Sequence, residues 1–255
     1  MRGRARSVSG VVVAALLSLT ACKPTSSSLG RYIEPGPPRY EVSCPDGESC
    51  SPSVALLVGL SAPSEPTRCT AALIGPHTAV TAGHCVAREL RNGVECGDLW
   101  LGFAGAERSP AEWIACRRIV TASARSANIL SPDYAILELE RTVTRPTIPV
   151  GEGEVPTGEV VRVLSVTADR FYDDLHEVRS RRCVVDDSQR LADWNPAPSS
   201  AIRVLSSCPI RQGSSGAPVL DADGRLRGLV HGGGPRYFAL GLMTLLPKPV
   251  DRHDG

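Results

Sequence analysis

The chain has 255 residues, of which 42% are hydrophobic, and its formal net charge is +1. This length leaves room for one large domain or two small ones with a buried core, and the apolar content suits a globular protein. The nearly balanced charge argues against a nucleic-acid-binding protein, because such proteins concentrate basic residues on one face.

The N-terminus has the layout of a targeting segment. Arg2, Arg4 and Arg6 form a positive region, and residues 11–19 form an apolar stretch that is too short to span a membrane as a helix. The stretch ends at Leu19, and with Thr20, Ala21 and Cys22 this leucine forms a sequence that resembles the lipobox of bacterial lipoproteins. In a lipobox, the cysteine is lipidated and becomes the first residue after cleavage. The alternative is an ordinary signal peptide with an incidental cysteine.

The lipobox resemblance implies a signal peptide over residues 1–21 and a lipid anchor at Cys22. Lipid chains attach a protein to a membrane without spanning it. Lys23, next to the cysteine, resembles the pattern of outer-membrane lipoproteins. We therefore expect an exported protein on the bacterial outer membrane, on its periplasmic or cell-surface side.

The remainder of the chain divides into a tether, a domain and a tail. Residues 22–42 are rich in Pro, Ser and Gly and lack periodicity, which predicts a flexible tether. A folded domain is expected over 43–250 and a short tail over 251–255. Within the domain, short β-branched runs bounded by turn residues predict strands. Examples lie in residues 54–60, 71–83, 134–140, 159–167, 201–206, 217–230 and 237–246.

These runs predict a mostly antiparallel β-protein, either a barrel or a sandwich. Asp223-Gly224 between two apolar runs is a hairpin signal. Arg179, Arg181 and Arg182 are interpreted as a local, solvated loop. His176 and its acidic neighbours are likewise interpreted as a charged surface loop.

A glycine-flanked pair of serines, Ser214 and Ser215, stands in the fragment "QGSSGAPV". By itself this pattern is typical of a turn. Two other fragments favour a catalytic interpretation. "CTAALIGPHTAVTAGHCV" presents His84 beside Cys85, and "SPDYAILELE" places Asp133 just before an apolar strand. A histidine serves as a general base when it is held near its nucleophile and oriented by a carboxylate. The alternative for the aspartate is an ordinary turn residue.

The chain order is histidine, aspartate, serine, which is the order of chymotrypsin-type enzymes. "TAGHC" resembles the "TAAHC" of trypsin-like serine proteases, "DYAILEL" is similar to their "DIALLxL", and "QGSSGAPV" to their "GDSGGPV". The resemblance covers roughly residues 54–246. It implies an all-β fold of two six-stranded antiparallel barrels stapled by disulfides. It also implies a serine endopeptidase that acts on protein or peptide substrates without a cofactor or metal.

The resemblance assigns roles to individual residues. Ser215 takes the nucleophile position, His84 that of the general base, and Asp133 that of the orienting acid. The N–H groups of Gly213 and Ser215 would form the oxyanion hole. An esterase-type elbow is rejected, because an elbow leads into a helix and this segment leads into a hairpin. The alternative from another class is a catalytically inactive protein-binding module on the same fold.

Several positions depart from the family pattern. Ser214 replaces the aspartate that pairs with a new N-terminal amine in animal enzymes, so we expect no trypsin-style zymogen switch. Pro209 stands at the expected base of the substrate pocket, which argues against cleavage after Lys or Arg. His231, Gly232 and Gly233 resemble the pocket wall. His231 has two interpretations: a replacement for the serine that contacts the triad aspartate, or a reader of acidic side chains as in glutamyl endopeptidases.

The chain contains nine cysteines, and setting Cys22 aside leaves eight, which predicts up to four disulfides in an exported chain. The sequence contains no CxxC or HExxH motif, the patterns that would indicate a metal site. Cys69 lies upstream of the histidine at the family's usual spacing and is expected to pair with Cys85. Cys183 and Cys208 flank the segment that leads to the serines and are expected to pair with each other. Elimination leaves the pairs Cys44–Cys50 and Cys96–Cys116.

Overall fold

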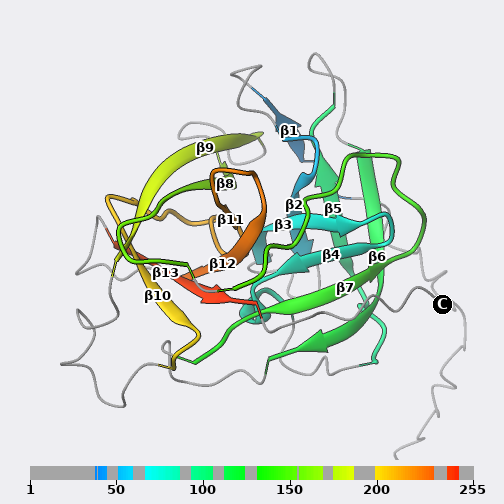
Figure 1. The fold of residues 1–255 in the computed structure, drawn as a ribbon. Coiled ribbons are helices and arrows are strands. Elements are labelled where there is room, and N and C mark those ends of the chain that lie inside the picture. The colour runs from blue at the N-terminus through cyan, green and yellow to red at the C-terminus, as the bar shows by residue number, and fades with distance from the viewer. Residues whose placement is uncertain are drawn as a thin grey trace, which may run out of the picture. The chain divides into compact units, whose positions relative to one another are not determined.

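The structure is a computed structural model of the chain. It describes residues 38, 40–44, 51–59, 67–86, 93–105, 112–123, 131–153, 155–168, 175–186, 199–232 and 240–246. Within these residues the protein is all-β, with one short 3-10 helix, η1 (Gly83–Cys85), and its main strands close into two barrels (Figure 1). No helix among the described residues is long and apolar enough to cross a membrane.

The first barrel has six strands, and every neighbouring pair is antiparallel. In their order around the barrel they are β2 (Val54–Gly59), β3 (Thr67–Gly75), β4 (Thr78–Thr81), β7 (Ala135–Leu139), β6 (Glu112–Ala122) and β5 (Leu99–Phe103). Closure leaves no free edge in this sheet.

The second barrel also closes through six antiparallel strands, because β8 pairs with both β9 and β11. In order they are β8 (Val160–Ala168), β9 (Leu175–Asp186), β10 (Ile202–Ser206), β13 (Leu240–Leu245), β12 (Leu226–Gly232) and β11 (Pro218–Leu220). A short strand, β1 (Glu41–Ser43), adds to β9 in parallel. The first two residues of β1 belong to the segment 22–42 that the sequence assigns to the tether.

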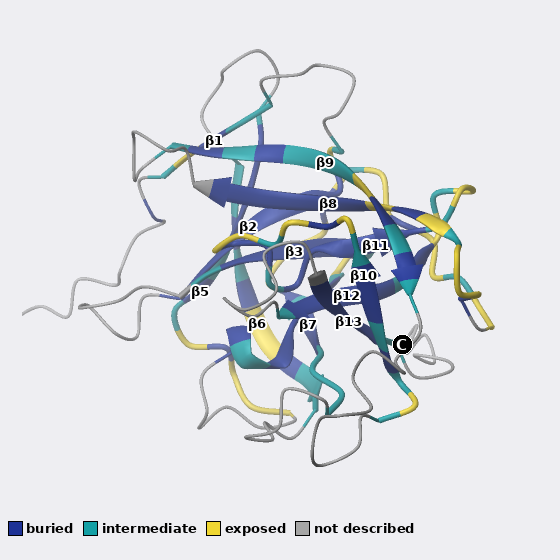
Figure 2. Ribbon diagram, turned by 90° about the vertical axis from the view of Figure 1, so that its left-hand side faces the viewer, coloured by how far each residue is buried: buried dark blue, intermediate teal, exposed yellow. Residues whose placement is uncertain are grey.

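The apolar run of β2 is buried along its whole length because each of its two faces meets a core. Ala55 and Leu57 belong to the cluster inside the first barrel. Val54, Leu56 and Val58 belong to a second cluster, which also contains residues of β8, β9, β11 and β12. A strand buried on both faces reads as a continuous apolar run. Figure 2 shows most strand segments as buried and many connecting turns as exposed.

The predicted hairpin is present as β11 and β12. Its turn places Gly224 at φ +76°, and Asp221 Oδ1 accepts the N–H groups of Asp223 and Arg225 at 3.0 and 2.9 Å. A glycine suits this turn because side-chain-bearing residues disfavour positive φ.

The expectation of charged loops around residues 176–182 is wrong. His176 and the three arginines lie on β9, which pairs with β8 over nine residues. His176 is 1% exposed and packs edge-on against the Tyr40 ring. Charged residues concealed the strand pattern, because they occupy positions on both of its faces.

Candidate active site

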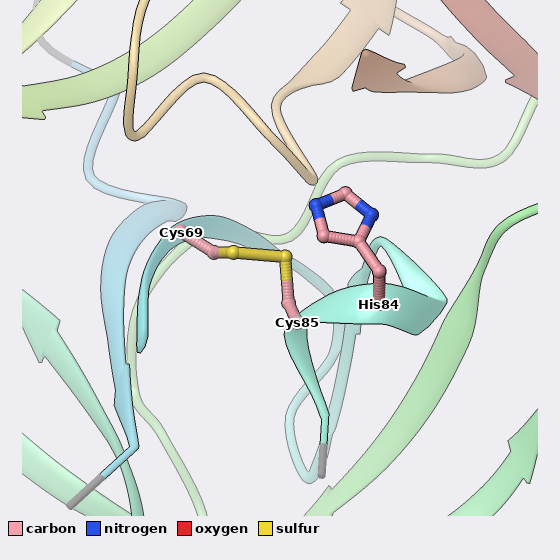
Figure 3. A group of neighbouring side chains, drawn as sticks. All are labelled: Cys69, His84 and Cys85. Atoms are coloured by element: carbon pink, nitrogen blue, oxygen red, sulfur yellow. A yellow bond between two sulfur atoms is a disulfide. The ribbon is translucent and has the colours of Figure 1, made fainter. Parts of the chain in front are cut away.

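The predicted base, His84, lies in η1, directly after β4. The predicted disulfide between Cys69 and Cys85 is present and ties η1 to β3. Figure 3 shows the imidazole standing beside this disulfide. The bond therefore restrains the backbone that carries the histidine.

His84 and Asp133 are brought together by two contacts. The imidazole Nδ1 lies 2.5 Å from Asp133 Oδ2, and the His84 backbone N–H donates to Oδ1 at 2.8 Å. A proton on Nδ1 satisfies the first contact and leaves Nε2 as the basic nitrogen. Gly83 makes the approach possible, because a Cβ there would lie 2.8 Å from Asp133 Oδ1 and 2.9 Å from Ser123 Oγ.

Asp133 is a half-buried carboxylate with a lowered pKa. Burial raises its pKa, but the hydrogen bond from His84, the charges of His84 and His231, and the backbone N–H of His84 together hold it below its ordinary value. The Asp133 side chain is only 18% exposed. The group is therefore ionised at neutral pH and able to orient an imidazole.

Thr244 on β13 connects Asp133 to His231 on β12. Thr244 Oγ1 accepts the Asp133 N–H at 3.1 Å and lies 2.8 Å from His231 Nδ1. His231 is 5% exposed. This placement beside Asp133 favours the interpretation in which His231 replaces the serine that contacts the family's aspartate, over the interpretation in which it binds a substrate side chain.

The loop with the two serines is fixed by two glycines at positive φ. Gly213 has φ +92°, and Gly216 has φ +80°. The Ser215 carbonyl accepts the Thr70 N–H at 2.7 Å, and Thr70 Oγ1 donates to the Gly213 carbonyl at 2.7 Å. A Cβ on Gly216 would lie 2.1 Å from the Thr70 carbonyl oxygen and 2.9 Å from the Ala82 nitrogen. The loop thus packs against the segments that flank the Cys69–Cys85 disulfide.

The proposed oxyanion donors have open hydrogen-bonding capacity. Among the described residues, no acceptor is recorded for the N–H groups of Gly213 or Ser215, whereas the intervening Ser214 N–H donates to the Arg211 carbonyl at 3.0 Å. Within the same described residues, the Ser215 hydroxyl makes no hydrogen bond to His84. Serine–histidine contacts are often long before substrate binds.

The remaining predicted site residues are described only in part. Pro209 is exposed, and Gly232 is half-buried at the end of β12. Gly233 and Cys22 lie outside the described residues. The predicted disulfides Cys96–Cys116 and Cys183–Cys208 are present, and Cys50 of the fourth pair lies outside the described residues.

Two threonines that support the site were not predicted. Thr70 and Thr244 are fully buried, and both hydroxyls bond to backbone groups of predicted site residues. A hydroxyl within an apolar strand run is the signal that identifies such residues, because burial of an unpaired hydroxyl is costly.

Cys69, His84 and Cys85 also gather their potential metal-binding atoms within 4.8 Å of one another. The two sulfurs are bonded to each other and are therefore not thiolates. Because the thiolate is the metal ligand, this group is explained by the disulfide.

Comparison with solved structures gives the same fold. A thermostable serine protease from an extremophilic microorganism has 19% identity and a TM-score of 0.58, covering 76% of this chain and 91% of that chain. HL collagenase has 16% identity and a TM-score of 0.60, covering 81% and 91%. An inactivated protease paralogue of the scabies mite has 18% identity and a TM-score of 0.59, covering 76% and 89%. At these identities the likeness establishes the fold alone.

A comparison with curated proteins found no match. The family model described as a trypsin-like peptidase domain matches residues 69–229, which is more than half of the chain and includes all three predicted triad residues. The chain belongs to the trypsin-like peptidase domain family.

Proposed function

We propose that the protein is a serine endopeptidase with the triad His84, Asp133 and Ser215. The observation that carries the proposal is the pair of contacts by which His84 holds both oxygens of Asp133. The chain order of the three residues and their place in a peptidase-family domain support it. Such a protein cleaves peptide bonds in proteins or peptides.

In the proposed reaction, Ser215 Oγ attacks the carbonyl carbon of the peptide bond while its proton passes to His84 Nε2. The N–H groups of Gly213 and Ser215 hold the oxyanion. The carbon–nitrogen bond then breaks, and the imidazolium gives its proton to the leaving amine. Water attacks the acyl-enzyme through the same base, which releases the carboxylic acid and restores the serine. Asp133 orients His84 and stabilises the imidazolium throughout.

The test is labelling of the purified domain with a fluorophosphonate probe. Wild type and Ser214→Ala should be labelled, and Ser215→Ala should not. Ser214→Ala is the matched control, because it removes the same hydroxyl from the adjacent residue. An unlabelled, folded wild type would contradict the proposal and would favour the inactive binding module on this fold.

We also propose that the protein is exported and anchored through lipid at Cys22. The positive segment, the short apolar stretch and the cysteine after Leu-Thr-Ala support this. Expression with an alkyne fatty acid should label the wild-type protein but not Cys22→Ser. Equal labelling of both proteins would contradict lipidation at this cysteine.

A further inference from the structure

Three polar residues share one face of the β8–β9 ladder in the second barrel: Ser165 is buried, Arg181 is half-buried, and the Arg179 side chain is 43% exposed. Across the β8–β9 ladder, Ser165 lies opposite Arg179, and Val163 lies opposite Arg181. Val163 and Cys183 belong to the apolar cluster enclosed by this barrel. Because side chains alternate along a strand, Ser165, Arg179 and Arg181 share the face of these two residues.

This face carries one positive charge, that of Arg181, which the described residues do not neutralise. Arg179 pairs with Glu177. Arg181 has no counter-ion among the described residues, and the charges that act on it are those of Arg211 and Arg179. Burial, followed by these two like charges, lowers the pKa of the Arg181 guanidinium. A guanidinium nevertheless stays protonated in proteins, so the half-buried charge persists.

The Ser165 hydroxyl provides an independent observation. Ser165 is 1% exposed, and its Oγ has no hydrogen-bond partner among the described residues. A buried hydroxyl without a partner is destabilising. An anion that accepts from this hydroxyl and from Arg181 would satisfy the hydroxyl and neutralise the guanidinium.

The arginine cluster (Arg179, Arg181 and Arg211) adjoins the loop that carries Ser215. Arg211 donates its backbone N–H to Ser214 Oγ at 3.3 Å, and the Cys183–Cys208 disulfide joins β9 to the start of this loop. On the other side, a Cβ on Gly213 would lie 2.7 Å from the Val166 carbonyl oxygen, next to Ser165. Arg211 is exposed, whereas Arg181 is half-buried, so the cluster extends from the surface inward.

We propose that the arginine cluster and Ser165 form a subsite that binds the carboxylate of an acidic side chain in the peptide substrate. This proposal rests on the proposed endopeptidase function and specifies its substrate class. A planar guanidinium binds a carboxylate through two parallel hydrogen bonds. The position of the cluster beside the catalytic loop favours a substrate side chain over a free anion as its ligand.

The first test compares Glu with Gln at each position around the scissile bond in a set of fluorogenic peptides. At one position, Glu should raise kcat/KM over Gln by about tenfold to a hundredfold, the effect typical of charged hydrogen bonds. Arg181→Gln should abolish this ratio. Arg182→Gln is the matched control, because it removes the same charge from an exposed neighbour on the opposite face of β9. Equal ratios in the two variants would overturn the proposal.

A second measurement separates the substrate side chain from a free anion. Sulfate at constant ionic strength should compete with the Glu peptide and leave hydrolysis of the Gln peptide unchanged. If sulfate instead accelerates hydrolysis of the Gln peptide by wild type but not by Arg181→Gln, the cluster binds a free anion, and the substrate assignment is wrong.

A third measurement tests the subsite by binding alone, without catalysis. Fluorescence anisotropy measures the Kd of the same Glu and Gln peptides for the Ser215→Ala variant, which has no nucleophile. Preference for Glu that disappears on adding Arg181→Gln supports the subsite even if wild type resists the fluorophosphonate. Labelled wild type without any Glu preference in binding or hydrolysis refutes the subsite alone and leaves the endopeptidase proposal standing.

Discussion

His84 contacts both carboxylate oxygens of Asp133: its Nδ1 lies 2.5 Å from Oδ2, and its backbone N–H donates to Oδ1 at 2.8 Å. The side chain and the main chain of His84 therefore both contact the same carboxylate. This arrangement fixes the ring orientation and the tautomer together. Asp133 therefore supports the backbone geometry of η1 in addition to placing a negative charge beside the imidazole.

Asp133→Asn should therefore lower kcat by about 10⁴, the effect of the corresponding change in a serine-protease triad, because an amide favours the wrong tautomer of the histidine. KM should change little, since the proposed role of the carboxylate is to orient His84 and not to bind substrate. Steady-state hydrolysis of a peptide substrate measures both. Glu138→Gln on β7 removes an outward-facing charge that pairs with Arg118 and should leave kcat unchanged. A loss below tenfold in Asp133→Asn would refute the assigned role.

The lowered pKa of Asp133 predicts how stability depends on pH. A carboxyl whose pKa is lower in the folded state than its ordinary value of 3.8 stabilises the fold when ionised. This contribution is complete above the ordinary value and is lost as the pH falls through the lower folded value. Urea unfolding across the acid range should show a steeper loss for wild type than for Asp133→Asn. Parallel pH curves for the two proteins would contradict this.

Alanine substitutions at Gly216 and Gly224 distinguish the cost of a steric clash from the cost of backbone strain. Both have positive φ, at +80° and +76°, but a Cβ on Gly216 would lie 2.1 Å from the Thr70 carbonyl oxygen, whereas Gly224 has nothing within 4 Å. Gly224→Ala should cost about 1–2 kcal/mol, the penalty of a left-handed conformation. Gly216→Ala should cost clearly more and abolish fluorophosphonate labelling, because the loop that carries Ser215 must move. Urea unfolding measures both costs, and equal values would show that the close contact is unimportant.

Predictions from the sequence were most accurate for features that depend on neighbouring residues, such as strands and turns. The β-rich pattern and the Asp223-Gly224 turn follow from strand alternation and turn chemistry, and both are present. The two-barrel fold and the pairing of Cys69 with Cys85 followed from resemblance to a family. Short-range patterns leave a barrel and a sandwich open, because closure depends on pairs such as β8 with β9 and β11.

The sequence predicted least where tertiary packing decides a residue's role. His176 stands among acidic residues in the sequence, yet it is buried where β1 pairs with β9 and the Tyr40 ring packs against the imidazole. Thr244 and His231 are 13 residues apart and meet only because β12 and β13 pair. Such contacts follow from register, which a single sequence does not specify.

The His231–Thr244 contact predicts two separable effects. His231→Ala and His231→Gln both remove a charge that lowers the pKa of Asp133, so acid unfolding should begin at a higher pH in both. Only Ala also leaves the buried Thr244 hydroxyl without its histidine partner, at a further cost of about 1–3 kcal/mol. Urea unfolding at neutral pH and in acid distinguishes the two effects. If acid unfolding began at the wild-type pH in both variants, His231 would not act on Asp133.

The disulfides offer a test of whether the Cys69–Cys85 bond serves the site as well as the fold. Cys69–Cys85 and Cys96–Cys116 close loops of similar length, with separations of 16 and 20 residues. Replacing either pair by alanine should therefore cost a similar amount, about 3 kcal/mol in the chain-entropy model. Only loss of Cys69–Cys85 releases η1, so this variant should lose most of its fluorophosphonate labelling rate while the Cys96–Cys116 variant keeps it. Unfolding in urea and labelling kinetics measure the two effects separately. Equal labelling rates in two folded variants would mean that the contacts of His84 with Asp133 hold the histidine without the disulfide.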